Sequence, residues 1–198
     1  QANCFCNNDT GDEIADNNIT VIKNAEIESY AKSGCVIGTT AWGFCRNDVA
    51  GCFDYLFIDE AGQLSVANLV GISQATNNIV LMGDQMQLGQ PSQGTHPGES
   101  GLSILDYLLH DSPIIEPHMG VFLDTTYRMH SAVNNFISNA IYDGKLRSDI
   151  DNDKQLIEVP SDYQGELDKP AGVIFIPIEH QGNTQASEEE VEAIIKHA

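Results

Sequence analysis

The sequence contains few basic residues: nine lysines and arginines stand against 29 aspartates and glutamates, giving a formal net charge of −20. Proteins that bind a polyphosphate chain gain much of their affinity from basic side chains that displace counterions. The composition therefore does not indicate a nucleic-acid binder. Because charges are screened over about 8 Å at physiological salt, a local basic patch on an acidic background remains open. So does a solvated acidic surface suited to a salty environment.

Long apolar runs, a secretory leader and a regular cysteine pattern are also missing. No run reaches the roughly 18–20 apolar residues that span a bilayer, and no basic segment leads into an apolar one, so we expect a cytoplasmic protein without membrane contact. Five cysteines, with Cys4 and Cys6 in an isolated C-x-C, indicate reduced thiols rather than a disulfide framework or a metal site. Because the sequence starts at Gln1 rather than Met and ends at Ala198 within an expected helix, we expect an internal fragment.

Short apolar runs alternate with helical patterns in the first half of the chain. We expect strands at 35–38, 53–58 and 78–82, helices at 19–33, 64–73 and 102–109, and loops at 1–18 and 89–101. Each expected strand ends in polar residues. Buried strands that alternate with helices are typical of an α/β fold, in which helices cover a parallel sheet. Ligands bind such sheets at the carboxyl ends of the strands.

Prolines and glycines between residues 111 and 120 indicate a domain boundary, so we expect one domain over residues 1–112 and a second over 113–198. In the second domain we expect strands at 121–123 and 173–178, helices at 131–142 and 187–197, and an acidic connection over 148–170. Ser187 and Glu190 match a capping box at the start of the last helix.

The segment FDYLFIDEAGQ, residues 53–63, brings two adjacent carboxylates to the end of an expected strand. In nucleotide hydrolases a first carboxylate holds Mg²⁺ and a second positions the attacking water. Asp59 and Glu60 are the candidates for these two roles. The pattern is weak by itself, because many strands end in solvated acids.

Two later segments have a similar design. In IVLMGDQMQLGQP, residues 79–91, Gly83 permits a sharp turn, and Gln87 can sense a terminal phosphate without adding charge. In LDTTYRMH, residues 123–130, Arg128 follows an expected strand and could reach a phosphate bound by the first domain. A solvated glutamine and a surface salt bridge are the alternatives.

The order and spacing of these segments resemble the Upf-like branch of the superfamily 1 helicases. DEAGQ resembles motif II, GDQMQLGQP motif III and TYRMH motif IV, and VIGTTAWGF, residues 36–44, resembles the short motif before motif II. The resemblance covers about residues 30–147. The wording of GTTAWGF and of THPGESGLSILDYLL, residues 95–109, is most similar to bacterial proteins that fuse such a helicase to a RecB-like nuclease.

The resemblance implies an ATP-dependent helicase built on a RecA-like P-loop NTPase core, with part of a second RecA-like domain. It implies ATP and Mg²⁺ as cofactors, a DNA or RNA single strand as partner, and a possible fused nuclease. The implied roles are Mg²⁺ binding for Asp59, water activation for Glu60, γ-phosphate contacts for Gln87 and Arg128, nucleotide contact or coupling for Asp84 and Tyr127, and nucleic-acid backbone contacts for Thr39 and Thr40.

The family's phosphate-cradling loop, G-x-x-x-x-G-K-[ST], does not occur in the 198 residues, so we expect the fragment by itself not to hydrolyse ATP. One alternative is a non-catalytic RecA-like scaffold that presents its acidic surface to a basic partner. Another is a metal-dependent nuclease, which needs more converging acids than Asp59 and Glu60. Trp42 could stack on a base, but we expect it in the core. For His130 we expect a structural hydrogen bond rather than metal binding.

Overall fold

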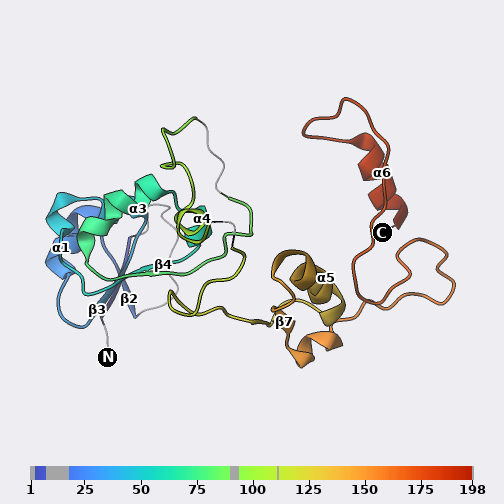
Figure 1. Ribbon diagram of the computed structural model, residues 1–198, viewed down its shortest axis with the longest axis horizontal. Coiled ribbons are helices and arrows are strands. Elements are labelled where there is room, and N and C mark those ends of the chain that lie inside the picture. Colours follow the sequence, from blue (N-terminus) through green and yellow to red (C-terminus); the bar gives the residue numbers. More distant parts are fainter. Residues whose placement is uncertain (1–2, 8–17, 90–93, 111, 198) are drawn as a thin grey trace. The chain divides into compact units, whose positions relative to one another are not determined.

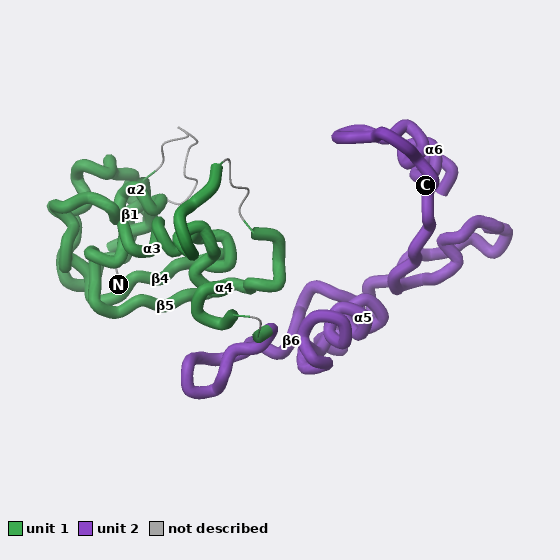
Figure 2. The backbone as a smooth tube through the Cα atoms, turned by 45° about the horizontal axis from the view of Figure 1, so that its top comes forward, with its two compact units in different colours: residues 1–112 green, residues 113–198 purple. Residues whose placement is uncertain are grey.

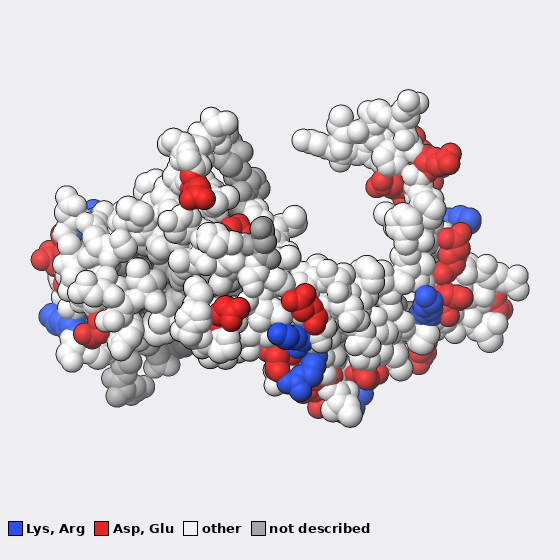
Figure 3. Space-filling model, in the orientation of Figure 1, with Lys and Arg blue, Asp and Glu red and all other residues white. Residues whose placement is uncertain are grey.

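The structure is a computed structural model that describes residues 3–7, 18–89, 94–110 and 112–197. It divides into two compact units, residues 1–112 (unit 1) and residues 113–198 (unit 2), which are coloured separately in Figure 2. Acidic side chains are spread over the visible surface of both units, and basic ones are few (Figure 3). No helix in the described ranges is long and apolar enough to cross a membrane.

Unit 1 contains two small parallel sheets rather than one (Figure 1). The first has the order β2-β1-β3, formed by β1 (Asn3–Cys6), β2 (Ile19–Val21) and β3 (Cys35–Gly38). The predicted strand at 35–38 is confirmed as β3. The predicted loop over 1–18 is wrong for residues 3–6, which form β1, and its residues 8–17 lie outside the described residues. The predicted helix over 19–33 is mostly wrong, because β2 and the 3-10 turn η1 (Asn24–Glu26) take its first half and only α1 (Ile27–Tyr30) is helical.

The second sheet pairs β4 (Leu56–Ile58) with β5 (Ile79–Leu81), and its register places Ile58 opposite Leu81. The helices α3 (Val66–Ile72) and α4 (Ile104–Leu109) confirm the predicted helices at 64–73 and 102–109. Each begins at a serine whose hydroxyl accepts a backbone N–H: Ser65 from Asn68 at 3.2 Å and Ser103 from Asp106 at 3.0 Å. The remaining elements of unit 1 are α2 (Ala41–Phe44), η2 (Asn47–Val49), η3 (Ala61–Gln63) and η4 (Ser73–Ala75).

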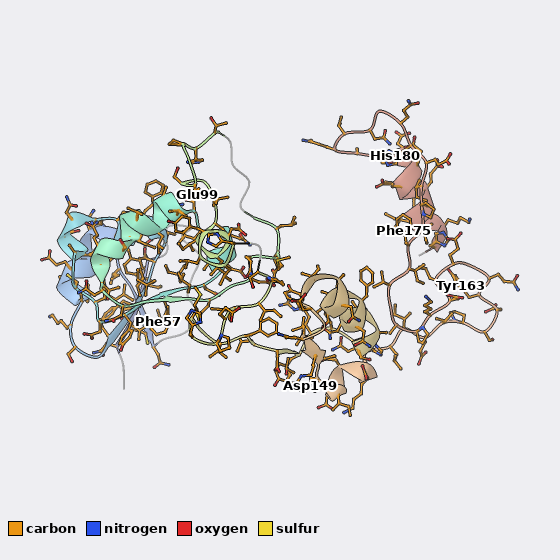
Figure 4. All side chains as sticks on the ribbon, in the orientation of Figure 1. Phe57, Glu99, Asp149, Tyr163, Phe175 and His180 are labelled. Atoms are coloured by element: carbon orange, nitrogen blue, oxygen red, sulfur yellow. The ribbon has the colours of Figure 1, made fainter. Side chains whose placement is uncertain are left out.

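The main core of unit 1 lies between the second sheet and its helices. The buried side chains come from α2, β4, α3 and α4 and the turns beside them: Phe44, Leu56, Ile58, Ala61, Ile72, Ala75, Ile104 and Leu105. The other face of β4 is different, because Phe57, which Figure 4 labels, is 63% exposed. Because β4 and β5 are parallel, both of their carboxyl ends lead into the same group of turns.

Those turns are in backbone contact. The amide of Met82 donates to the carbonyl of Ile58, and the amide of Ala61 donates to the carbonyl of Met82, both at 2.8 Å. A Cβ on Gly83 would lie 2.7 Å from the Ala61 nitrogen, and a Cβ on Gly62 would lie 2.4 Å from the Asp84 carbonyl oxygen. Glycine at both positions therefore allows the two turns to touch.

Unit 2 is built around α5 (Ser131–Ile141), which confirms the predicted helix over 131–142. A short parallel pair, β6 (Thr125–Thr126) and β7 (Arg147–Ser148), packs with it, followed by η5 (Ile150–Lys154). The buried Asn152 side chain donates to the Thr126 carbonyl at 2.9 Å, which ties η5 to β6. Asp124 pairs with Arg147, and this hydrogen bond, together with one from the Thr125 hydroxyl, lowers the pKa of the Asp124 carboxyl.

Two strand predictions in unit 2 are wrong. Residues 121–123 form no strand, and Val121 and Leu123 are about four-fifths exposed, at 82% and 81%. Residues 173–178 also form no strand, and Phe175 projects from irregular chain (Figure 4). The last helix, α6 (Glu188–His197), is confirmed, and the amide of Glu190 donates to the Ser187 hydroxyl at 3.2 Å as half of the predicted capping box.

The contact between the two turns yields a stability prediction. In Gly83→Ala the added methyl must push the turn away from Ala61 and Gly62, so we expect the free energy of unfolding to fall by about 1–3 kcal/mol. Gly94→Ala is the control, because a Cβ there meets nothing within 4 Å. Urea denaturation followed by circular dichroism measures both variants, and equal stability of the two would contradict the proposed crowding.

A second prediction concerns pH and unit 2. The amide of Ser131, at the start of α5, donates to Asp153 at 2.9 Å, and this bond, with the Ser131 hydroxyl and nearby His130, lowers the pKa of the Asp153 carboxyl. A carboxylate with a lowered pKa stabilises the fold above its unfolded pKa of about 3.9, and this contribution disappears as the pH falls through the folded pKa.

We therefore expect Asp153→Asn to be less stable than wild type at pH 6, and the difference to shrink as the pH falls below the unfolded pKa of about 3.9 and through the folded pKa. Asp168→Asn, at an exposed acid of the same unit, serves as the control. Urea titrations at several pH values measure the difference, and a gap between wild type and Asp153→Asn that stays constant with pH would refute the assignment.

Candidate functional site

The turn after β4 presents the two predicted carboxylates at the edge of the sheet. Asp59 and Glu60 are both exposed, and neither has an ion-pair partner among the residues that the structure describes. Glu60 has a left-handed backbone, with φ 54° and ψ 40°, and its amide donates to the Asp59 carboxylate at 3.0 Å. This conformation costs a non-glycine residue free energy, and such residues concentrate at functional sites. The turn therefore keeps both carboxylates accessible at a fixed place.

The turn after β5 is organised by Asp84. Its carboxylate accepts the amide of Met86 and the side-chain amide of Gln87, each at 3.0 Å. The Gln85 side chain donates to the carbonyl of Ser112 at 2.7 Å and holds the other side of the turn to the end of unit 1. The hydrogen bond to Asp84 orients the side-chain amide of Gln87. Because Gln87 is exposed, a ligand can still reach this amide. Gln90 and Pro91, the end of the predicted motif, lie outside the described residues.

The two turns share one surface hollow. Gln63, from the turn after β4, lines it together with Met86, Gln87, Leu88 and Gly89 from the turn after β5. Of the predicted residues only Gln87 is among those that line this hollow. Asp59, Glu60 and Asp84 lie in the same two turns, which the parallel pairing of β4 with β5 brings together. Gln63 and Gly62 were not singled out from the sequence. The sequence signal that could have predicted this close contact is the glycine that follows each of the two strands, Gly62 after β4 and Gly83 after β5.

The donor set fits a magnesium ion whose shell is completed by other ligands. Mg²⁺ is typically held by one or two carboxylates, with waters and substrate phosphates supplying the remaining oxygens. Asp59 and Glu60 offer such a pair, and no group of three or more potential metal ligands occurs within the described ranges.

Thr39 and Thr40 directly follow β3, at the carboxyl edge of the other sheet of unit 1. The Thr39 hydroxyl donates to the side-chain oxygen of Asn24 at 2.8 Å. Thr40 precedes α2, is exposed, and makes no side-chain capping hydrogen bond. Of the two hydroxyls, that of Thr40 is the one that can donate to a ligand without breaking a bond within the protein.

The prediction that Trp42 fills the core is wrong, because its side chain is 78% exposed. The interior of α2 is instead supplied by Gly43 and Phe44, which are both buried. Helical periodicity decides this, since a residue next to two buried positions on a single turn faces outward.

The remaining predicted residues belong to unit 2. Tyr127 is 76% exposed and Arg128 is also exposed, directly after β6. Within the described part of the chain Arg128 has no ion-pair partner, whereas Arg147 of the same unit is paired with Asp124. His130 is a structural hydrogen-bonder as predicted, because its Nδ1 accepts the amide of Ala132 at 3.0 Å.

Comparisons with known proteins find matching domain families over most of the chain. Two family models, each described as an AAA domain, match residues 9–90 and residues 101–197. The predicted α/β fold of the RecA-like type is thereby confirmed.

Several curated helicases resemble the chain over part of their length. A "Probable helicase with zinc finger domain" from Homo sapiens is 34% identical over 127 residues, which is 60% of this chain and 6% of that protein. The "DNA replication ATP-dependent helicase/nuclease dna2" from Schizosaccharomyces pombe is 33% identical over 94 residues, 48% of this chain and 7% of that protein. The "ATP-dependent helicase NAM7" from Saccharomyces cerevisiae is 28% identical over 134 residues, 67% of this chain and 13% of that protein.

The chain thus spans a small part of the curated relatives it matches. The two domain matches follow one another along the chain. The three curated relatives named above are all helicases. Together they show a chain made of two AAA-type domain matches and support its place among the superfamily 1 helicases.

Proposed function

We propose that this chain is the central part of a helicase motor, which couples ATP hydrolysis to movement along a single strand of DNA or RNA. Residues 1–112 are then the later part of a first RecA-like domain, and residues 113–198 the earlier part of a second. The observation that carries the proposal is the pair of parallel strands β4 and β5, whose ends hold Asp59, Glu60, Asp84 and Gln87 in touching turns. Helicase names among the relatives support the same reading.

In this proposal the two carboxylates divide the work. Asp59 would hold Mg²⁺ through its carboxylate oxygens, and the bound ion would neutralise charge on the phosphate oxygens. Glu60 would orient the attacking water and accept its proton. The backbone at Glu60 supports this division. Its left-handed conformation ends the extended course of β4 at Glu60, and the Glu60 amide donates to the Asp59 carboxylate.

Gln87 would report the terminal phosphate to the rest of the turn. Its side-chain NH₂ has two hydrogens, so it could donate to a γ-phosphate oxygen while it keeps its bond to Asp84. The Asp84 carboxylate also accepts the Met86 amide. A movement of Gln87 on loss of the phosphate would therefore be passed to Asp84 and to the turn that Asp84 organises.

Arg128 would supply positive charge to the same phosphate from the second domain. It is exposed and not engaged by an acid in the described ranges, which leaves its guanidinium available. Exposed Tyr127 would lie beside the nucleotide. On the nucleic-acid side, the Thr40 hydroxyl would donate to the backbone, and Thr39 would support that position through its bond to Asn24.

The finer family assignment is also a proposal. The segments over residues 36–44 and 95–109 support a place near the bacterial proteins that join an Upf-like helicase to a RecB-like nuclease. One relative is itself named a helicase/nuclease, which supports a nuclease domain elsewhere in the parent protein.

The role of Glu60 is testable in a parent protein in which a G-x-x-x-x-G-K-[ST] loop precedes this chain. Glu60→Gln keeps the side chain's size and removes its basicity, so we expect nucleic-acid-stimulated ATPase activity to fall by about 10²–10⁴-fold. Glu99→Gln, at an exposed loop position, is the matched control and should behave as wild type. The 198-residue chain alone should show no turnover.

Wild-type ATPase activity in Glu60→Gln would remove this residue from the proposed role. A parent protein that hydrolyses no nucleotide under any condition would instead favour the scaffold interpretation, to which the net charge of −20 is well suited.

The role of Arg128 has a matched comparison within the same unit. Arg128→Lys retains the charge but loses the planar fork of donors, and an arginine at a transferring phosphate is worth about 10³–10⁵ in rate, so we expect kcat to fall by at least about 10²-fold. Arg147→Lys should leave kcat unchanged, because Arg147 is engaged with Asp124. Steady-state kinetics decides the matter, and similar kcat values for the two variants would count against Arg128.

A further inference from the structure

The exposure of Trp42 differs in kind from that of the other large aromatic residues of unit 1. Tyr55 and Phe57 are 60% and 63% exposed, but Phe57 lies on strand β4 and the two rings sit beside each other, with centroids 6.2 Å apart. A face of a sheet is the surface that an α/β fold covers with helices. Trp42 lies instead on the outward side of α2, at the carboxyl edge of β3, where this kind of fold binds ligands rather than helices.

The backbone around Trp42 is held in place on both sides. A Cβ on Gly43 would lie 2.5 Å from the Thr39 side chain and 2.9 Å from the Asn24 side-chain oxygen, so this turn of helix rests directly on the Thr39–Asn24 pair. The next residue, Phe44, is buried and meets Phe53 edge to face, with ring centroids 5.5 Å apart. The backbone that carries the indole is therefore held by packing on both sides, and Thr40 precedes it by two residues.

Unit 1 carries few positive charges. The basic residues between positions 1 and 112 are Lys23, Lys32 and Arg46. Arg46 is paired with Asp48 at 2.6 Å. A nucleic acid bound to unit 1 would therefore release few counterions, and phosphate contacts could supply little of its affinity. Most of the binding free energy must come from contacts that do not depend on charge.

Stacking of a base on an aromatic ring is such a contact. It requires an accessible base, which a single strand offers and a duplex hides, and it adds affinity with any of the bases. We propose that Trp42 is a stacking platform for one base of a single-stranded nucleic acid, while the adjacent Thr40 hydroxyl donates to the backbone. The inference rests on the proposed function, because it names the contact by which unit 1 holds the helicase's strand.

The chain carries its own probe for this proposal, because Trp42 is its single tryptophan. Base stacking quenches indole fluorescence, so titration of the 198-residue chain with a dT or rU 12-mer should quench the emission. A blunt duplex of equal length should quench it much less. Inorganic polyphosphate is the control for charge alone, and it should leave the emission unchanged because it has no bases.

Variants then measure the contribution of the stack by fluorescence anisotropy of a labelled 12-mer. Trp42→Ala should weaken binding by about 5- to 150-fold, the range that corresponds to one stacked base, and Trp42→Phe should weaken it less. Because stacking involves no net charge, the fold-change for Trp42→Ala should be the same at 50 mM and 200 mM salt. Val70→Ala removes a side chain of α3 that is 68% exposed, and it should have no effect.

The outcomes separate this proposal from the helicase function. If Trp42→Ala binds as tightly as wild type while Thr40→Ala binds more weakly, the strand contacts unit 1 without stacking, and only the platform is refuted. A wild-type chain that binds no single strand, or equal quenching by polyphosphate, also overturns the platform. The helicase function is tested separately, by the ATPase activity of the parent protein.

Discussion

The parallel pairing of β4 with β5 is the constraint on which the rest of unit 1 depends. Its hydrogen bonds continue past the last strand residues, so that the amides of Ala61 and Met82 extend the ladder into the turns. Both turns start from the same sheet edge, and their backbones pass so closely that a methyl group does not fit at Gly83. Four polar side chains from residues 59–87 are neighbours for this reason and not because they attract one another. Two of them, Asp59 and Glu60, would repel each other.

This dependence explains which parts of the structure could be predicted from sequence. The strands β3, β4 and β5 are apolar runs that end abruptly in polar residues, and α3, α4, α5 and α6 show helical spacing with a serine or histidine at their starts. Local signals of this kind predict elements well, because pattern and cap act within a few residues. The turns that carry Asp59 and Gln87 follow directly from where these strands end.

The errors have a common physical origin. β1 and β2 are short and polar enough to resemble loop or helix, and they become strands only because β1 pairs with β3 and β2 pairs with β1. Residues 121–123 and 173–178 show the opposite case, since their apolar patterns predict strands but no partner pairs with them in the described structure. Trp42 was misplaced because a large aromatic residue is usually buried, whereas its neighbours Gly43 and Phe44 already occupy the inward side of α2. Long-range pairing and competition for interior space are not local properties of a sequence.

The left-handed backbone of Glu60 is unfavourable for folding at the position where the proposed chemistry needs a carboxylate. Glycine or asparagine adopts this conformation with less steric cost, so a change from glutamate to either would relax the turn. In the role proposed for Glu60 the same change would remove the base, and selection for hydrolysis would then keep a glutamate in an unfavourable conformation. Lineages that retain this fold but no longer hydrolyse nucleotides should drift toward small residues at this position, which would give a one-residue marker for retired motors among relatives of this chain.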